Sequence, residues 1–143
     1  MENDNLRINK LREYLFDIIK DLNEQYQQIN VNFLSDDINN YSLDKIPVTR
    51  EVMTWITGDT ICRDVYSFRS RMDYSADVIS NIENVGFYET FEKVIEQKNK
   101  QNDLPDIPNI ESISCLNCGT MAKANTNTAE FDIQIQIVYL EKL

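Results

Sequence analysis

The chain is most regular at Phe131-Asp132-Ile133-Gln134-Ile135-Gln136-Ile137-Val138-Tyr139, where apolar side chains take every odd-numbered position. Polar side chains take the even-numbered positions as far as Gln136. A period of two is typical of a β-strand with one apolar face, and this strand would extend about 30 Å at ~3.3 Å per residue. A helix would scatter the same apolar side chains around its circumference, so the stretch predicts a long strand packed on one face.

Further segments upstream have the composition of strands. Two of them flank Gly58-Asp59, which predicts the turn of a β-hairpin. The strand after this turn places Arg63, Arg69 and Arg71 at odd-numbered positions, which predicts a row of guanidinium groups on one face of the sheet. The predicted segments are Val31–Leu34, Glu51–Thr57, Thr60–Met72 and Ile110–Cys115.

Helical periodicity is present in two parts of the chain. Asn5–Tyr26 carries an apolar stripe that includes Leu11 and Ile18, opposite a charged face. The central region predicts a pair of helices separated at Gly86. The predicted fold class is α+β, in a single domain over residues 1–143. It has a mostly antiparallel sheet of four to five strands, with the N-terminal helix and the central helix pair packed on it.

Composition narrows the range of functions. The 143 residues hold 24 acids against 14 bases, a net charge of −10, and no histidine. The absence of histidine removes His-based triads and His-ligated metal sites. An acidic domain is a poor phosphate binder, which argues against specific nucleic-acid binding. Residues 1–5 do not resemble a signal peptide, and no apolar run approaches the roughly 18 to 20 residues that span a bilayer. We therefore expect no catalytic residue, cofactor, metal or membrane partner.

Cys115-Leu116-Asn117-Cys118 is a short motif with a known chemistry. Its spacing fits half of a zinc site or a redox pair. Structural zinc normally needs four Cys or His ligands, and Cys62 is far away in the sequence. A redox pair should begin a helix, whereas Cys115 ends a predicted strand. Small side chains within a strand are the simpler interpretation, and a thiol or zinc-binding module using Cys115 and Cys118 is the alternative.

Five residues are candidates for contacts with partner proteins. The arginine row can pair with acids of its own domain or of another subunit, and phosphates fit the net charge least well. Trp55, beside the hairpin turn, is either a core residue or an interface anchor. Tyr88 is either structural or a partner contact. The polar segment Thr120–Thr128 predicts a mobile loop that orders against a partner. The interface candidates are Arg63, Arg69, Arg71, Trp55 and Tyr88.

Four segments, in a fixed order and spacing, carry a resemblance to a known family. They are Ile46-Pro47 with the hairpin through Gly58-Asp59, Arg63-Asp64-Val65-Tyr66-Ser67-Phe68-Arg69-Ser70-Arg71 followed by Tyr74, Asn81-Ile82-Glu83-Asn84-Val85-Gly86-Phe87-Tyr88-Glu89 with the helix to Gln97 and Leu104-Pro105, and Phe131–Tyr139. Over residues 44–141 the chain resembles phage tail terminator proteins of Gram-positive phages, also called tail completion or minor capsid proteins, which have relatives in tail-like bacteriocins. None of these segments is a catalytic fingerprint.

The resemblance implies a structural virion protein that forms a hexameric ring on the finished tail tube, stops its polymerisation and offers a docking surface to the head–tail connector. Its partners would be further copies of itself, the tail tube protein, the sheath protein of a contractile tail, and the connector. DNA would pass through the ring without specific binding, which suits the −60 charge of six chains. The protein would be assembled in the bacterial host cytoplasm and located at the head-proximal end of the tail. A head–tail joining or minor capsid protein and a monomeric cytosolic binding protein are also consistent with the sequence.

Overall fold

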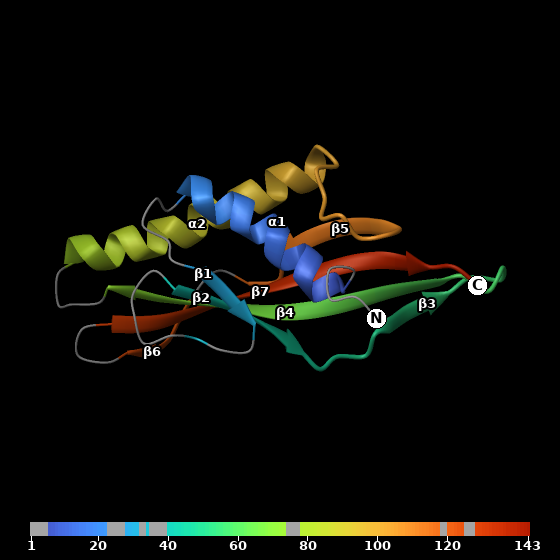
Figure 1. The fold of residues 1–143 in the computed structure, drawn as a ribbon, viewed down its shortest axis with the longest axis horizontal. Helices are drawn as coiled ribbons and strands as arrows, with labels where there is room; N and C mark the ends of the chain where they lie inside the picture. Colours follow the sequence, from blue (N-terminus) through green and yellow to red (C-terminus); the bar gives the residue numbers. More distant parts are fainter. Residues whose placement is uncertain are drawn as a thin grey trace.

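The computed structural model of the protein describes residues 6–22, 28–31, 34, 40–73, 78–117, 120–124 and 128–143. Within these residues a seven-stranded, mostly antiparallel sheet carries two helices on one face (Figure 1). The predicted α+β fold class is therefore confirmed, although the sheet has more strands than the four to five expected.

Two long antiparallel strands, β4 (Thr60–Asp73) and β7 (Thr128–Glu141), form the centre of the sheet. They pair without interruption from Thr60 opposite Glu141 to Asp73 opposite Thr128. Each has two shorter strands along its outer side, β2 and β3 on β4, and β5 and β6 on β7, while β1 lies parallel to β2 at the edge. The shorter strands are β1 (Gln28–Val31), β2 (Asn40–Ile46), β3 (Glu51–Thr54), β5 (Ile110–Cys115) and β6 (Thr120–Ala124).

The core lies between the sheet and the helices α1 (Arg7–Leu22) and α2 (Val78–Lys100). The odd-numbered side chains of β7 from Ala129 to Tyr139 are all buried, as the alternation in the sequence predicts. The apolar stripe of α1 is also buried, which confirms the prediction for that helix. Aromatic rings of β4 and α2 join the two layers, since the rings of Phe68 and Phe91 stack with centroids 5.4 Å apart.

The predicted helix pair is a single continuous helix, so the prediction of a break at Gly86 is wrong. A glycine costs a helix only about 1 kcal/mol relative to alanine, and packing of the helix outweighs that cost. Phe91 and Ile95 in the following turns are buried in the core. The helix instead ends near Asn102, whose φ of 58° is the left-handed conformation that asparagine tolerates after a helix C-terminus.

The strand predictions differ from the structure at three places. The first strand is β1, which ends at Val31, where the predicted strand Val31–Leu34 was to begin. β2 was not predicted because Tyr41 and Leu43 are its only buried apolar side chains. β6 occupies part of the segment Thr120–Thr128, so the prediction of a loop there is wrong for residues 120–124. These residues carry little apolar patterning, and they form a strand because β7 extends beyond β5 and offers an edge for pairing.

Candidate assembly surface

β3, the turn after it and the start of β4 form a hairpin, residues 51–62, which we call the arm, and the end of β7 pairs with the start of β4 on its other side. It extends beyond the helical layer, and the C-terminus lies beside its tip (Figure 1). The turn is closed by a hydrogen bond from the Trp55 amide to the Asp59 carbonyl (2.8 Å). Gly58 has a φ of 92°, which residues with a side chain rarely adopt, and it lies against Leu143. The local sequence therefore fixes the shape of the arm as predicted from Gly58-Asp59.

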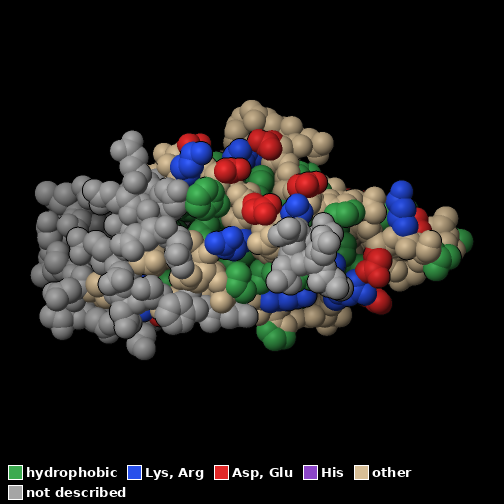
Figure 2. Space-filling model, viewed as in Figure 1, with side chains coloured by type: hydrophobic (Ala, Val, Ile, Leu, Met, Phe, Trp, Pro, Cys, Tyr) green, Lys and Arg blue, Asp and Glu red, His purple; other side chains and the backbone are tan. Residues whose placement is uncertain are grey.

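The arm exposes apolar side chains on both of its faces. Every residue of β3 is exposed, so neither face of this strand is covered by another layer. Ile56 at the turn is fully exposed, and 52% of the Trp55 surface is accessible. Clusters of large apolar side chains at a surface mark sites of association, and Figure 2 shows such side chains at the tip. The exposed apolar side chains at this end are Val48, Val52, Met53, Trp55, Ile56 and Leu143.

A buried carboxylate lies at the base of the arm. Asp64 of β4 is only 1% exposed, and its oxygens lie 2.6 Å from Arg7 Nε and 3.7 Å from Lys45 Nζ. The hydroxyls of Tyr66 and Tyr139 also donate to it, over 3.2 Å and 3.3 Å. Burial, together with the nearby Asp64 charge, raises the pKa of Tyr66, so the phenol stays neutral. Asp64 thus holds the start of α1 and the end of β2 against the central strands.

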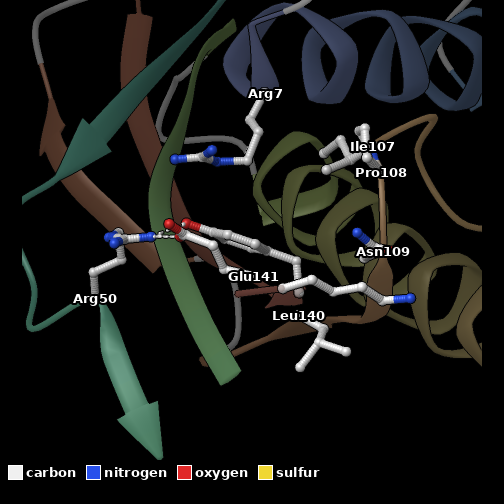
Figure 3. Close-up of a pocket in the computed structure, with 9 residues that line it drawn as sticks. Arg7, Arg50, Ile107, Pro108, Asn109, Leu140 and Glu141 are labelled. Carbon is white, nitrogen blue, oxygen red and sulfur yellow. Dashed lines mark hydrogen bonds and ion pairs between the residues drawn. The ribbon is translucent and has the colours of Figure 1, made fainter. Parts of the chain in front are cut away.

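Two hollows lie near the base of the arm and share Arg50, and Asp64 lines the smaller of them. The larger, of about 540 Å³, is lined by Arg7, Arg50, Glu141 and Lys142 among others (Figure 3). The smaller, of about 230 Å³, is lined by Lys45, Arg50, Arg63 and Asp64 among others. Arg50 forms an ion pair with Glu141, and this lowers the pKa of the Glu141 carboxyl. We call the cations that line the two hollows the basic patch, which consists of Arg7, Lys45, Arg50, Arg63 and Lys142.

The predicted arginine row does not act as one unit. Arg69 forms ion pairs with Asp44 of β2 and, at 3.0 Å, with Glu130 of β7, so its charge is neutralised within the sheet. Arg71 lies further along the strand, and one of its nitrogens donates to the Thr128 hydroxyl over 3.3 Å. Arg63 is separate from both, because its Nε donates to the Thr49 carbonyl and its side chain borders the smaller hollow. Only Arg63 of the row belongs to the basic patch.

The two aromatic candidates have opposite positions. Trp55 is on the exposed arm, so it is not a core residue and stays an interface candidate. Tyr88 is only 1% exposed, and its ring stacks on Phe131 with centroids 5.4 Å apart. The prediction of Tyr88 as a partner contact is therefore wrong for the folded chain, since an aromatic residue on the inner side of α2 is core.

The cysteine motif ends a strand as predicted. Cys115 is the last residue of β5 and is half-buried, while Cys118 lies outside the described residues. Among the residues described, no group of three or more His, Cys, Asp or Glu side chains is placed to hold a metal ion. Within the same part of the chain, no helix combines the length and the apolar composition that crossing a bilayer requires.

No known family model matches the sequence, and no curated protein matches it.

Sequence reasoning missed four of the five members of the basic patch, because these four come from separate places in the chain. Arg7 begins α1, Lys45 is near the end of β2, Arg50 precedes β3 and Lys142 follows β7. Only the pairing of β2, β3 and β7 around β4 brings them together. One signal was available in the sequence. Asp64 is an acid at a core position of an alternating strand, and a buried acid requires cations nearby.

Proposed function

We propose that this protein is a structural assembly protein that forms a closed ring at the end of a phage tail tube, as the resemblance to tail terminators implies. The exposed apolar arm carries the proposal. A fully exposed Ile56 beside a half-exposed Trp55 does not stabilise a monomeric domain, whereas a subunit of an assembly buries both side chains.

The ring follows from the kind of contact that the arm makes. The arm is at one end of the molecule, and a neighbour receives it on a different surface. Such a head-to-tail contact repeats from copy to copy and ends only when the ring closes. The resemblance sets the number of copies at six, so the ring matches the sixfold tube that it caps.

The net charge supports a ring through which DNA moves. Each chain carries −10, and we expect the cations of the basic patch to contact a protein partner. Each phosphate that a protein neutralises adds affinity, so an acidic ring lets DNA slide past without being held. The ring would thus end tube growth and present a new surface to the head connector, located at the head-proximal end of the tail.

Co-assembly with the tail tube protein of the same particle tests the proposal. Tube protein is polymerised with and without the purified chain, and tube lengths and gold-labelled chain are recorded in electron micrographs. The proposal predicts label at one end of each tube and an end to growth there. Label along the tube wall, or tubes that grow equally with and without the chain, would overturn it.

A further inference from the structure

The basic patch is an unusual concentration of charge for this chain. It holds five of the fourteen cations, together with the two carboxylates Asp64 and Glu141 that line the same hollows. Outside these residues the chain keeps nine cations against twenty-two acids. The patch therefore has a positive excess, whereas the remainder of the chain is strongly negative. A second copy of this chain is a partner of matching charge.

The outer face of α1 is the acidic surface that fits best. Glu13, Asp17 and Asp21 are exposed and follow one another at four-residue spacing, so they form one stripe along the helix. Like charges at this spacing destabilise a helix, and Asp21 also lies at the C-terminal end, where the helix dipole disfavours a carboxylate. Glu13 has a partner within the helix, because Lys10 Nζ lies 3.9 Å from its carboxylate, so Asp17 and Asp21 are the acids of the stripe that a partner would meet. Phe16, 36% exposed, lies beside the stripe and adds an apolar contact.

The two surfaces are placed so that one copy can use both at once. Arg7 of the patch begins α1, and Asp21 of the stripe is fourteen residues further along, about 21 Å at 1.5 Å per residue. In Figure 2 acidic side chains lie over the helical layer, whereas the apolar tip of the arm is at one end. A neighbour bound at one surface leaves the other accessible, which is the condition for a chain of contacts that closes into a ring.

We propose that the arm and basic patch of one copy bind the outer face of α1 of the next copy, with Arg63 and Lys142 facing the acidic stripe and Trp55 and Ile56 contacting the surface beside Phe16. This contact rests on the proposed ring. Charge pairs guide the approach of the two surfaces and fix their orientation, and the arm supplies the apolar burial.

Reciprocal charge reversal tests the contact. One variant carries Asp17→Lys and Asp21→Lys, and the other carries Arg63→Glu and Lys142→Glu. The first variant keeps one like-charge spacing, but it gives Glu13 a favourable partner four residues later and removes a carboxylate from the C-terminal end of the helix, so α1 should fold as before. Glu89→Lys with Glu111→Lys is the matched control for the first variant, because it makes the same charge change at exposed positions on α2 and β5. Circular dichroism checks that every variant is folded.

Self-association is measured by sedimentation velocity over a concentration series, and again with tube protein present. Each reversed variant alone should assemble at least about tenfold more weakly than wild type. The control should assemble like wild type after allowance for net charge. An equimolar mixture of the two reversed variants should form mixed pairs. Reversed variants that assemble like wild type, or a mixture that forms no mixed pairs, would overturn this contact while leaving the ring intact. A wild-type chain that stays monomeric even with tube protein would overturn the ring and this contact together.

Discussion

Replacing Ile56 by Ser should weaken assembly without affecting folding. Ile56 is fully exposed at the arm turn, so its replacement removes no contact within the chain and should change the free energy of unfolding by less than about 0.5 kcal/mol. Burying an Ile side chain at an interface contributes about 1.5–3 kcal/mol. The subunit contact should therefore weaken by roughly 10- to 150-fold.

Trp55→Ala extends the same reasoning to a larger side chain. About half of the Trp55 surface is accessible. An aromatic side chain buries roughly 150–250 Å² in all, so about 100 Å² remains for a partner, or ~2.5 kcal/mol at 25 cal/mol per Å². This variant also loses packing within the arm, so its folding must be compared with that of Ile56→Ser.

The assay separates folding from association. Urea denaturation gives the free energy of unfolding, and sedimentation velocity gives the concentration at which half of the chains are assembled. Leu116→Ser, which removes an exposed apolar side chain in the bend after β5, is the control and should leave assembly unchanged. Equal assembly of Ile56→Ser and wild type would refute the role of the arm, as would an equal loss in Leu116→Ser.

Three further predictions concern stability. Tyr66→Phe removes a hydroxyl that donates to a buried carboxylate and should lower the free energy of unfolding by about 1.5 kcal/mol. Tyr88→Phe removes a buried hydroxyl with no partner among the described residues, so it should leave the free energy of unfolding unchanged or raise it by up to about 1 kcal/mol. Urea denaturation that ranks the two variants in the opposite order would refute this. Because Arg50 lowers the Glu141 pKa in the folded chain, the pair stabilises above the ordinary carboxyl pKa of 4.5 and loses that contribution as the pH falls further. The thermal stability of wild type should therefore decline more steeply in acid than that of Arg50→Gln, and parallel curves would contradict the pairing. Gly58→Ala forces a side chain into left-handed backbone at a cost of about 1–2 kcal/mol, so amide exchange in β3 should accelerate while that in β7 is unchanged.

The elements that could be predicted from the sequence are those whose apolar pattern is strong. The alternation from Phe131 to Tyr139, the strand from Thr60, and the stripe of α1 each bury one face, and each is present. β2 and β6 were not predicted, because they form strands by pairing with a neighbouring strand and carry little apolar alternation of their own. The break predicted at Gly86 is absent for a related reason, since core packing of α2 outweighs the small energetic penalty of one glycine in a helix.

The candidate surface was predicted only in part. Trp55 and the hairpin turn could be found because a turn sequence followed by an alternating strand is a local signal. The basic patch could not, because register between distant strands places Lys45, Arg50 and Arg63 around Asp64. The arginine row lies on one face as predicted, and the alternative of pairing within the domain holds for Arg69, which is neutralised by acids that cross-strand pairing brings to it.

The most direct test of the proposed ring is an electron-microscopic reconstruction of the tail's head-proximal end from the particle that encodes the chain. We predict one ring of six copies on the last tube layer, with each arm against the adjacent copy. A tube end that lacks this chain, or copies of it that do not touch one another, would contradict the proposal.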